Sequence, residues 1–157
     1  MNFTAIDFET ANAGRASACA LGLVQVNEGQ IIAEHNWLID PQSPFDGRNI
    51  AIHGITPSMV RGQPTFVELW PTLEPLLQGQ IVVAHNASFD MSVIRYCLDE
   101  AGTSYPSFQY LCTYEYRREA GGRRSANDFS DFSDFSEFSD SSFRLGINQG
   151  PAYKDKP

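Results

Sequence analysis

Two acidic residues separated by one position, Asp7 and Glu9, are the first residues whose types and spacing could do chemistry. They lie at the end of an alternating apolar run, residues 2–10, which predicts a β-strand. Side chains at i and i+2 of a strand share a face, so both carboxylates would stand side by side while Phe8 packs on the other face. Such like charges repel, and their oxygens suit Mg²⁺ or Mn²⁺. The alternative is an acidic strand end that simply faces solvent.

A third carboxylate, Asp90, follows a short, fully apolar run at residues 81–84. Such a run predicts a strand buried on both faces, and the helical pattern after it extends to about Ala101. Asp90 would then lie in the first turn of a helix, where the helix dipole favours a negative charge. The alternative is that Asn86, Ser88 or Asp90 merely caps this helix.

Other patterns predict the elements that must position these side chains. Two β-prone runs, residues 18–26 and 30–39, flank the turn-forming residues 27–29, which predicts a hairpin. With the first strand, this gives an antiparallel three-stranded start. Residues 40–48 are rich in proline and glycine and are predicted to form a loop, and residues 109–112 are predicted to form a further short strand.

Two helices between these strands are predicted from their capping residues. Thr56–Pro57 can start a short helix, because proline is favoured at the first helical position. Thr65 can cap a helix over residues 66–77, whose apolar side chains recur at helical spacing. Pro71 and Pro75 fall inside that span, and we expect them to weaken or break the helix.

Composition limits the classes of protein that this sequence can represent. The chain has 157 residues, a mass of 17.5 kDa, a net charge of −8 and an isoelectric point near 4.7. One domain fits this length, and the charge excludes a tight duplex binder that relies on basic residues. Cys19, Cys97 and Cys112 lack zinc or disulfide spacing, which favours reduced thiols. Because no leader or membrane-spanning run is visible, we expect a cytoplasmic protein without a membrane partner.

The character of the sequence changes at about Gly121. Residues 127–140 repeat an acidic residue, phenylalanine and serine with a period of three. This period fits neither a helix nor a strand, and the composition favours disorder. The sequence therefore predicts a domain over residues 1–120 and a low-complexity tail over residues 121–157, disordered or produced by a frameshift.

Three ordered motifs resemble the DnaQ-like (DEDD superfamily) 3′–5′ exonucleases, a family that includes the proofreading epsilon subunit of bacterial DNA polymerase III. The motifs are Asp7-Phe8-Glu9-Thr10, Ile52-His53-Gly54-Ile55-Thr56 and His85-Asn86-Ala87-Ser88-Phe89-Asp90. The resemblance covers about residues 2–116. It implies an α/β fold of the ribonuclease H-like type, a mixed sheet flanked by helices, which we expect to be incomplete at its C-terminal end. It also implies two divalent metal ions, Mg²⁺ or Mn²⁺, held by acidic side chains.

The resemblance also implies a role for each matching residue. Asp7, Glu9 and Asp90 match three of the four metal carboxylates of the family and are the expected catalytic residues. Thr10 stands where contact with the terminal nucleotide is expected. The full set of expected substrate-side residues is Phe8, Thr10, His53, Asn86 and Phe89.

The sequence departs from the family at its third motif. That motif places a His or Tyr four or five residues before a fourth Asp on a helix, where it acts on the attacking water. The histidines here are His35, His53 and His85, and the Phe-Ser-Asp repeat occupies the expected region. We therefore expect one weakened metal site, low or absent activity, and exposed apolar surface that favours self-association. A truncated or frame-shifted exonuclease is the simplest interpretation.

Three functions remain open at this level. The leading one is an enzyme, a 3′–5′ exonuclease that hydrolyses phosphodiesters at single-stranded DNA or RNA 3′ ends with two metal ions. The second is a catalytically dead remnant that binds nucleic acid or a polymerase. The third is a structural interaction module, which leaves the three carboxylates unexplained. Metal-dependent release of mononucleotides distinguishes the first from the others.

Overall fold

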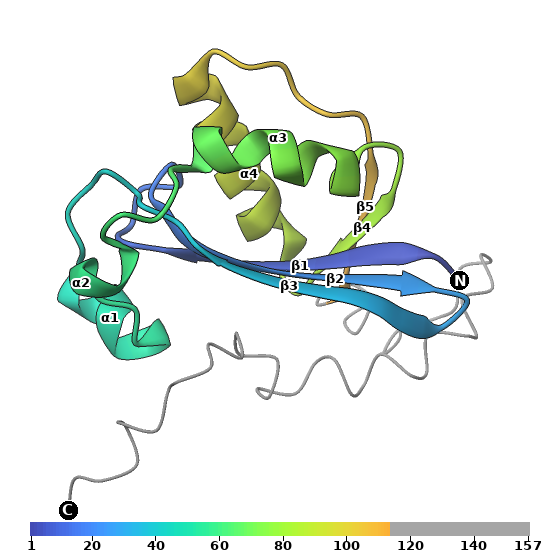
Figure 1. Cartoon of the computed structure of the whole chain (residues 1–157), viewed down its shortest axis with the longest axis horizontal. Coiled ribbons are helices and arrows are strands. Elements are labelled where there is room, and N and C mark those ends of the chain that lie inside the picture. Colours follow the sequence, from blue (N-terminus) through green and yellow to red (C-terminus); the bar gives the residue numbers. More distant parts are fainter. Residues whose placement is uncertain (114–157) are drawn as a thin grey trace, which may run out of the picture.

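A mixed five-stranded sheet forms the centre of the computed structural model, which describes residues 1–113 (Figure 1). The strand order is β3-β2-β1-β4-β5. The sheet is antiparallel between β1, β2 and β3, and parallel between β1, β4 and β5. The strands are β1 (Phe3–Thr10), β2 (Ala18–Asn27), β3 (Gln30–Leu38), β4 (Ile81–Ala84) and β5 (Gln109–Cys112).

The predicted antiparallel start is confirmed. β2 and β3 are joined by Glu28 and Gly29, which have φ values of 52° and 77°. Positive φ at both central residues matches the right-handed twist of the flanking strands, which is why this sequence turns here. β1 pairs with β2 so that Asp7 lies opposite Gly22 and Glu9 lies opposite Ala20.

The pairing of β1 and β2 shifts at the end of β1. Glu9 is paired with Ala20 but Thr10 with Ala18, so Cys19 is an extra residue on β2. Such a bulge bends the strand and changes the direction of nearby side chains. The chain is therefore bent where the Asp7/Glu9 motif ends.

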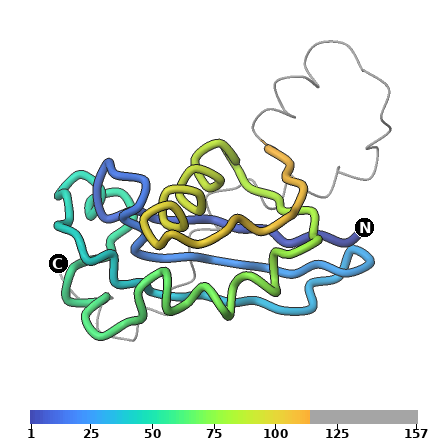
Figure 2. Tube along the Cα trace, turned by 90° about the horizontal axis from the view of Figure 1, so that it is seen from above, coloured from blue at the N-terminus to red at the C-terminus, as the bar shows by residue number. Residues whose placement is uncertain are grey.

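Helices α3 (Phe66–Leu77) and α4 (Ala87–Ala101) cover one face of the sheet (Figures 1 and 2). The helix α3 has the predicted bounds and is not broken by its prolines. Thr65 and Glu68 form a reciprocal capping box at its start, and both Pro71 and Pro75 are exposed. The lost hydrogen bonds therefore lie on the solvent side, while the apolar side remains packed. The shared core includes Ile6, Phe8, Leu73, Val82 and Leu98.

Two short helices lie at one end of the sheet. α2 (Pro57–Val60) follows Thr56 as predicted. α1 (Gly47–His53) was not predicted, and it begins inside the predicted loop of residues 40–48. The residues that favour this helix lie at its two ends. The Asp46 side chain caps its start by accepting a hydrogen bond from the N–H of Arg48 at 2.8 Å, and Gly54 ends the helix with φ 77°.

The short length of β4 determines what lies beside the end of β1. β4 pairs with β1 at Thr4 and Ala5 and ends at Ala84, as the sequence predicted. The second half of β1 therefore extends beyond its parallel neighbour, and the chain enters α4 there. Gly102 ends α4 with φ 60°. The Phe-Ser-Asp repeat lies outside the described residues. Among residues 1–113, no helix is both long and apolar enough to cross a membrane.

Candidate active site

Asp7 and Glu9 share one face of β1, as predicted. Both side chains are half-buried, whereas Phe8 between them is 3% exposed in the core below α3. The Phe8 ring lies 6.2 Å from that of Phe66. Because the Phe8 ring is buried, Phe8 could contact a substrate only through its backbone atoms. The pair of carboxylates is thus fixed by an apolar side chain on the opposite face of the strand.

Asp90 joins this pair from the first turn of α4. Its side chain is 1% exposed, and its Oδ1 accepts a hydrogen bond from the N–H of Phe8 at 2.9 Å. The N-cap residue of α4 is Asn86, whose side chain makes no capping hydrogen bond. The Asp90 side chain instead reaches across to β1. It occupies the edge of β1 that β4 leaves unpaired, beside the residue between Asp7 and Glu9.

The electrostatics of this cluster are unfavourable for three charged carboxylates. Burial raises the pKa of Asp90 to about 8, the Phe8 N–H opposes this shift, and the charges of Asp7 and Glu9 add to it. Burial also raises the pKa of Asp7, while the nearby charge of His85 lowers it. A cation near these groups would favour their charged forms.

The donor set fits a hard divalent cation by its chemistry. Three carboxylates that repel one another offer the oxygen ligands that Mg²⁺ and Mn²⁺ prefer. As they stand, however, no three His, Cys, Asp or Glu side chains within residues 1–113 are gathered closely enough to hold a metal ion. The observations that favour a metal are therefore the burial of Asp90 and its repulsion by Asp7 and Glu9, which together disfavour the charged form of Asp90 unless a cation is near.

Thr10 is held by two side chains of α1. Asn49 Nδ2 donates a hydrogen bond to the Thr10 carbonyl at 2.8 Å, and His53 Nε2 lies 3.2 Å from the same oxygen. His53 Nδ1 accepts the N–H of Ile55 at 3.0 Å, so Nε2 carries the proton of the neutral ring. Burial lowers the pKa of His53, which favours this neutral form. Sequence reasoning missed Asn49, because no helix was predicted around it.

Cys19 lies on the bulge beside this cluster. Its Sγ is 4.0 Å from His53 Nε2, and burial, followed by the charge of Glu9, raises its pKa to about 12. The thiol therefore stays neutral and is a poor metal ligand. All three cysteines are free, which confirms the prediction of reduced thiols.

The motif of residues 85–90 forms the turn between β4 and α4. Asn86 has a left-handed backbone with φ 61°, and its Oδ1 accepts a hydrogen bond from Ser88 at 3.0 Å. His85 is exposed and its Nδ1 lies 2.9 Å from Thr113 Oγ1. Phe89 packs against the core, and the guanidinium of Arg15 lies 4.3 Å from the centre of its ring. The motif thus brings Asp90 and Phe89 to the end of β1.

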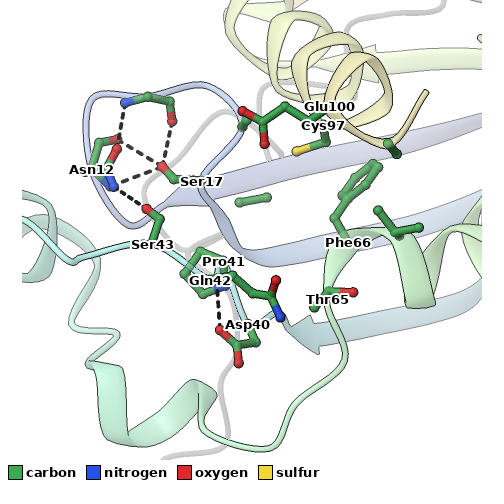
Figure 3. A pocket seen from close by; sticks show the side chains of 15 residues that line it. Asn12, Ser17, Asp40, Pro41, Gln42, Ser43, Thr65, Phe66, Cys97 and Glu100 are labelled. Carbon is green, nitrogen blue, oxygen red and sulfur yellow. Dashed lines mark hydrogen bonds between the residues drawn. The ribbon is translucent and has the colours of Figure 1, made fainter. Parts of the chain in front are cut away.

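A separate pocket of about 570 Å³ lies on the side of the sheet that carries α3 and α4 (Figure 3). It is lined by the β1–β2 loop, the segment around Asp40, the start of α3 and the end of α4. None of the expected catalytic residues lines it. The loop in its wall is held by Asn12, whose Nδ2 donates to Ser43 Oγ at 2.6 Å and to the Pro44 carbonyl at 2.7 Å.

The sheet order, the helices on one face and the carboxylates at the end of β1 define a ribonuclease H-like fold of the exonuclease type. The chain belongs to the RNase_T exonuclease family, which matches residues 4–134. The family resemblance and the ribonuclease H-like fold class inferred from sequence are thus confirmed, whereas the incomplete C-terminal end and the missing third family motif stay predictions. The match ends inside the segment predicted as the tail, and the boundary at residue 120 stays a prediction.

Three relatives named as DNA polymerase III proteins or nucleases are similar in sequence to part of this chain. A PolC-type DNA polymerase III of Thermotoga petrophila is 34% identical over 95 residues, 59% of this chain and 7% of that protein. A putative bifunctional exonuclease/endonuclease of Mycobacterium tuberculosis is 29% identical over 133 residues, 79% of this chain and 20% of that protein. A DNA polymerase III subunit epsilon-like protein of Rhodobacter capsulatus is 29% identical over 100 residues, 60% of this chain and 14% of that protein. The chain thus spans only a small share of each relative.

Solved structures share the fold at low sequence identity. Exonuclease X, in complex with 5′ overhanging duplex DNA, has a TM-score of 0.63 and 24% identity over 85% of this chain and 73% of that chain. The nuclease domain of 3′hExo, a DEDDh family member bound to rAMP, has a TM-score of 0.60 and 16% identity over 76% of this chain and 68% of that chain. At these identities the likeness establishes the fold alone.

Proposed function

We propose that this chain is a metal-dependent 3′–5′ exonuclease that acts on single-stranded nucleic acid. One observation carries the proposal: the Asp90 carboxylate accepts the N–H of Phe8, the residue between Asp7 and Glu9, where β1 extends beyond β4. Membership of an exonuclease family supports it independently. Neither observation depends on which nucleic acid is cleaved.

In this proposal Asp7, Glu9 and Asp90 hold the divalent ions, Mg²⁺ or Mn²⁺, that exonucleases of this family generally use. Bound ions supply the charge that activates water and stabilises the leaving 3′ oxygen. The buried Asp90 keeps one oxygen on the Phe8 N–H and thereby orients its second oxygen. Thr10 and Phe89 contact the terminal nucleotide. The backbone carbonyl of Thr10 is held in place by the side chains of Asn49 and His53.

A second candidate function is a domain that binds nucleic acid or a polymerase without cleaving. Two observations favour it. No three potential ligands within residues 1–113 are gathered around one point, and the sequence has no histidine beyond His85. A domain of this kind keeps the fold of the family but lacks the group that acts on the attacking water.

Release of mononucleotides from 3′-labelled single strands separates the two functions. Purified protein is incubated with DNA and RNA oligonucleotides in Mn²⁺, in Mg²⁺ and in EDTA. We expect release in the metal buffers, none in EDTA and none from Asp7→Asn in any buffer. Binding without release by the wild type favours the second function, and release that persists in Asp7→Asn or in EDTA contradicts the proposed one.

A further inference from the structure

Arg15 is a cation that lies against the helical turn that carries Asp90. Residues 1–113 contain four arginines, Arg15, Arg48, Arg61 and Arg95, and no lysine. Of these, Arg15 lies against the first turn of α4, with its guanidinium 4.3 Å from the ring centre of Phe89. Phe89 immediately precedes Asp90, whose carboxylate is bound to Phe8. One positive charge therefore lies against the residue that precedes Asp90 in the first turn of α4.

The loop that carries Arg15 is internally braced. The N–H of Ala11 donates to the carbonyl of Ser17 at 2.8 Å and closes the loop at its base. Ser17 Oγ donates to the Gly14 carbonyl at 2.6 Å, and the Gly14 N–H donates to Asn12 Oδ1 at 2.8 Å. Asn12 also ties the loop to Ser43 (Figure 3) and to the Pro44 carbonyl. Because the loop is already ordered, binding through Arg15 costs little conformational entropy.

The guanidinium is held by its face, which leaves its edge for a ligand. An arginine that stacks on an aromatic ring keeps the N–H donors around the rim of its plane available. Within residues 1–113 no carboxylate forms an ion pair with Arg15, although eleven acidic residues lie in that part of the chain. Such an unpaired, stacked guanidinium matches the geometry of a phosphate, which it can bind through two parallel hydrogen bonds.

We infer that the Arg15–Phe89 pair is a phosphate subsite that receives the backbone of a single-stranded nucleic acid beside the carboxylate cluster. The inference rests on the proposed function for the identity of the ligand. The loop after β1 would then bind the phosphate backbone. The acidic motif alone cannot bind it, because carboxylates repel phosphate. The subsite also explains how a chain of net charge −8 holds an anionic strand.

Arg95 provides a matched control on the same helix. Its guanidinium also lies over an aromatic ring, 5.5 Å from the centre of Tyr96, and both side chains are exposed. Arg95→Ala removes the same charge and the same kind of contact as Arg15→Ala. The two variants differ in whether the aromatic partner adjoins Asp90.

The test is binding of a short fluorescein-labelled phosphorothioate oligothymidylate, which resists hydrolysis, measured by fluorescence anisotropy in Mn²⁺ over a range of salt concentrations. We expect Arg15→Ala to weaken binding roughly tenfold, and to lower the slope of log K against log salt by about 0.7, the contribution of one phosphate contact. Arg15→Lys should keep most of the slope but lose part of the affinity, and Arg95→Ala should match the wild type.

Equal affinities and slopes for Arg15→Ala and Arg95→Ala would overturn the subsite, and so would a wild type that does not bind. Thermal melting of each variant confirms that the fold is intact, and Arg15→Lys remains informative if Arg15→Ala does not fold. Failure of the proposed function is a different result, because binding of a resistant strand does not require release of nucleotides. A protein that binds through Arg15 but releases nothing supports the subsite and the non-cleaving alternative together.

Discussion

The side chain of Asp90 and the backbone N–H of Phe8, 82 positions apart in sequence, are joined by a hydrogen bond of 2.9 Å. This bond occupies the edge of β1 that β4 leaves free, and it carries a buried carboxylate to the residue between Asp7 and Glu9. A strand edge that would otherwise need water or another strand is thus satisfied by an acidic side chain. The same bond fixes Asp90 beside the strand that carries the other two candidate metal ligands, Asp7 and Glu9.

Metal-free protein should lose stability as the pH rises from about 6.5 to 8. The pKa of Asp90 is raised to about 8, so the folded state holds a proton that the unfolded state has released. The folded state then binds more protons, and the free energy of unfolding falls with rising pH by roughly 1–2 kcal/mol over this window. Urea denaturation in EDTA at several pH values measures this change in the free energy of unfolding.

Asp90→Asn is the matched variant for this pH effect, because the amide oxygen can still accept the Phe8 N–H but does not titrate. We expect its stability to be nearly flat across the same window. The pKa of His53 is lowered, so its contribution changes below its ordinary value of 6.5 and does not interfere. A wild-type slope that Asp90→Asn leaves unchanged would show that another group is responsible.

Removing one carboxylate should separate metal binding from stability. Asp7→Asn relieves repulsion at Asp90, so we expect the metal-free variant to melt at or above the wild-type temperature. The same variant should bind Mn²⁺ at least tenfold more weakly in isothermal titration calorimetry, since one charged ligand is lost. Glu34→Gln, on the exposed surface of β3, is the control and should change neither quantity. Unchanged Mn²⁺ affinity in Asp7→Asn would remove this residue from the ligand set.

Asn49→Ala should lower activity by loosening Thr10. The variant deletes the donor that lies 2.8 Å from the Thr10 carbonyl, and we expect a loss of about 1 kcal/mol in unfolding free energy. If Asn49 positions Thr10 for the substrate, kcat falls several-fold while the Mn²⁺ dependence is unchanged. Asn36→Ala, on an exposed part of β3, should leave both parameters as they are. A loss of stability with wild-type kcat would limit Asn49 to a structural role.

Two neighbouring core residues of α3 should respond differently to truncation. Trp70 is buried and its Nε1 has no hydrogen-bond partner among residues 1–113, so Trp70→Phe removes an unpaired donor along with some contact area. We expect the free energy of unfolding to stay within about 1 kcal/mol of the wild type. Leu73→Ala opens a cavity at a fully buried position and should cost roughly 2–5 kcal/mol. Similar losses in both variants would mean that the Trp70 donor has a partner in solution.

The local elements of the fold could be predicted because their signals are local. Thr65 and Glu68 mark the start of α3, and the turn at Glu28 and Gly29 sets the β2–β3 hairpin. The prediction for α3 was wrong in one respect, because Pro71 and Pro75 do not break it. Their lost hydrogen bonds face solvent, and exposure is a property of packing that sequence spacing does not show.

The sequence by itself determined that Asp7 and Glu9 share a face and that Asp90 begins a helix, because strand and helix periods are set by the backbone. Tertiary structure alone decided that Asp90 reaches the strand that carries Asp7 and Glu9, since the length of β4 relative to β1 leaves the Phe8 N–H open to Asp90. It also decided that Asn49 holds Thr10 and that Arg15 stacks on Phe89. These contacts join segments far apart in the chain, and their distances follow from packing between elements rather than from the order of residues within them.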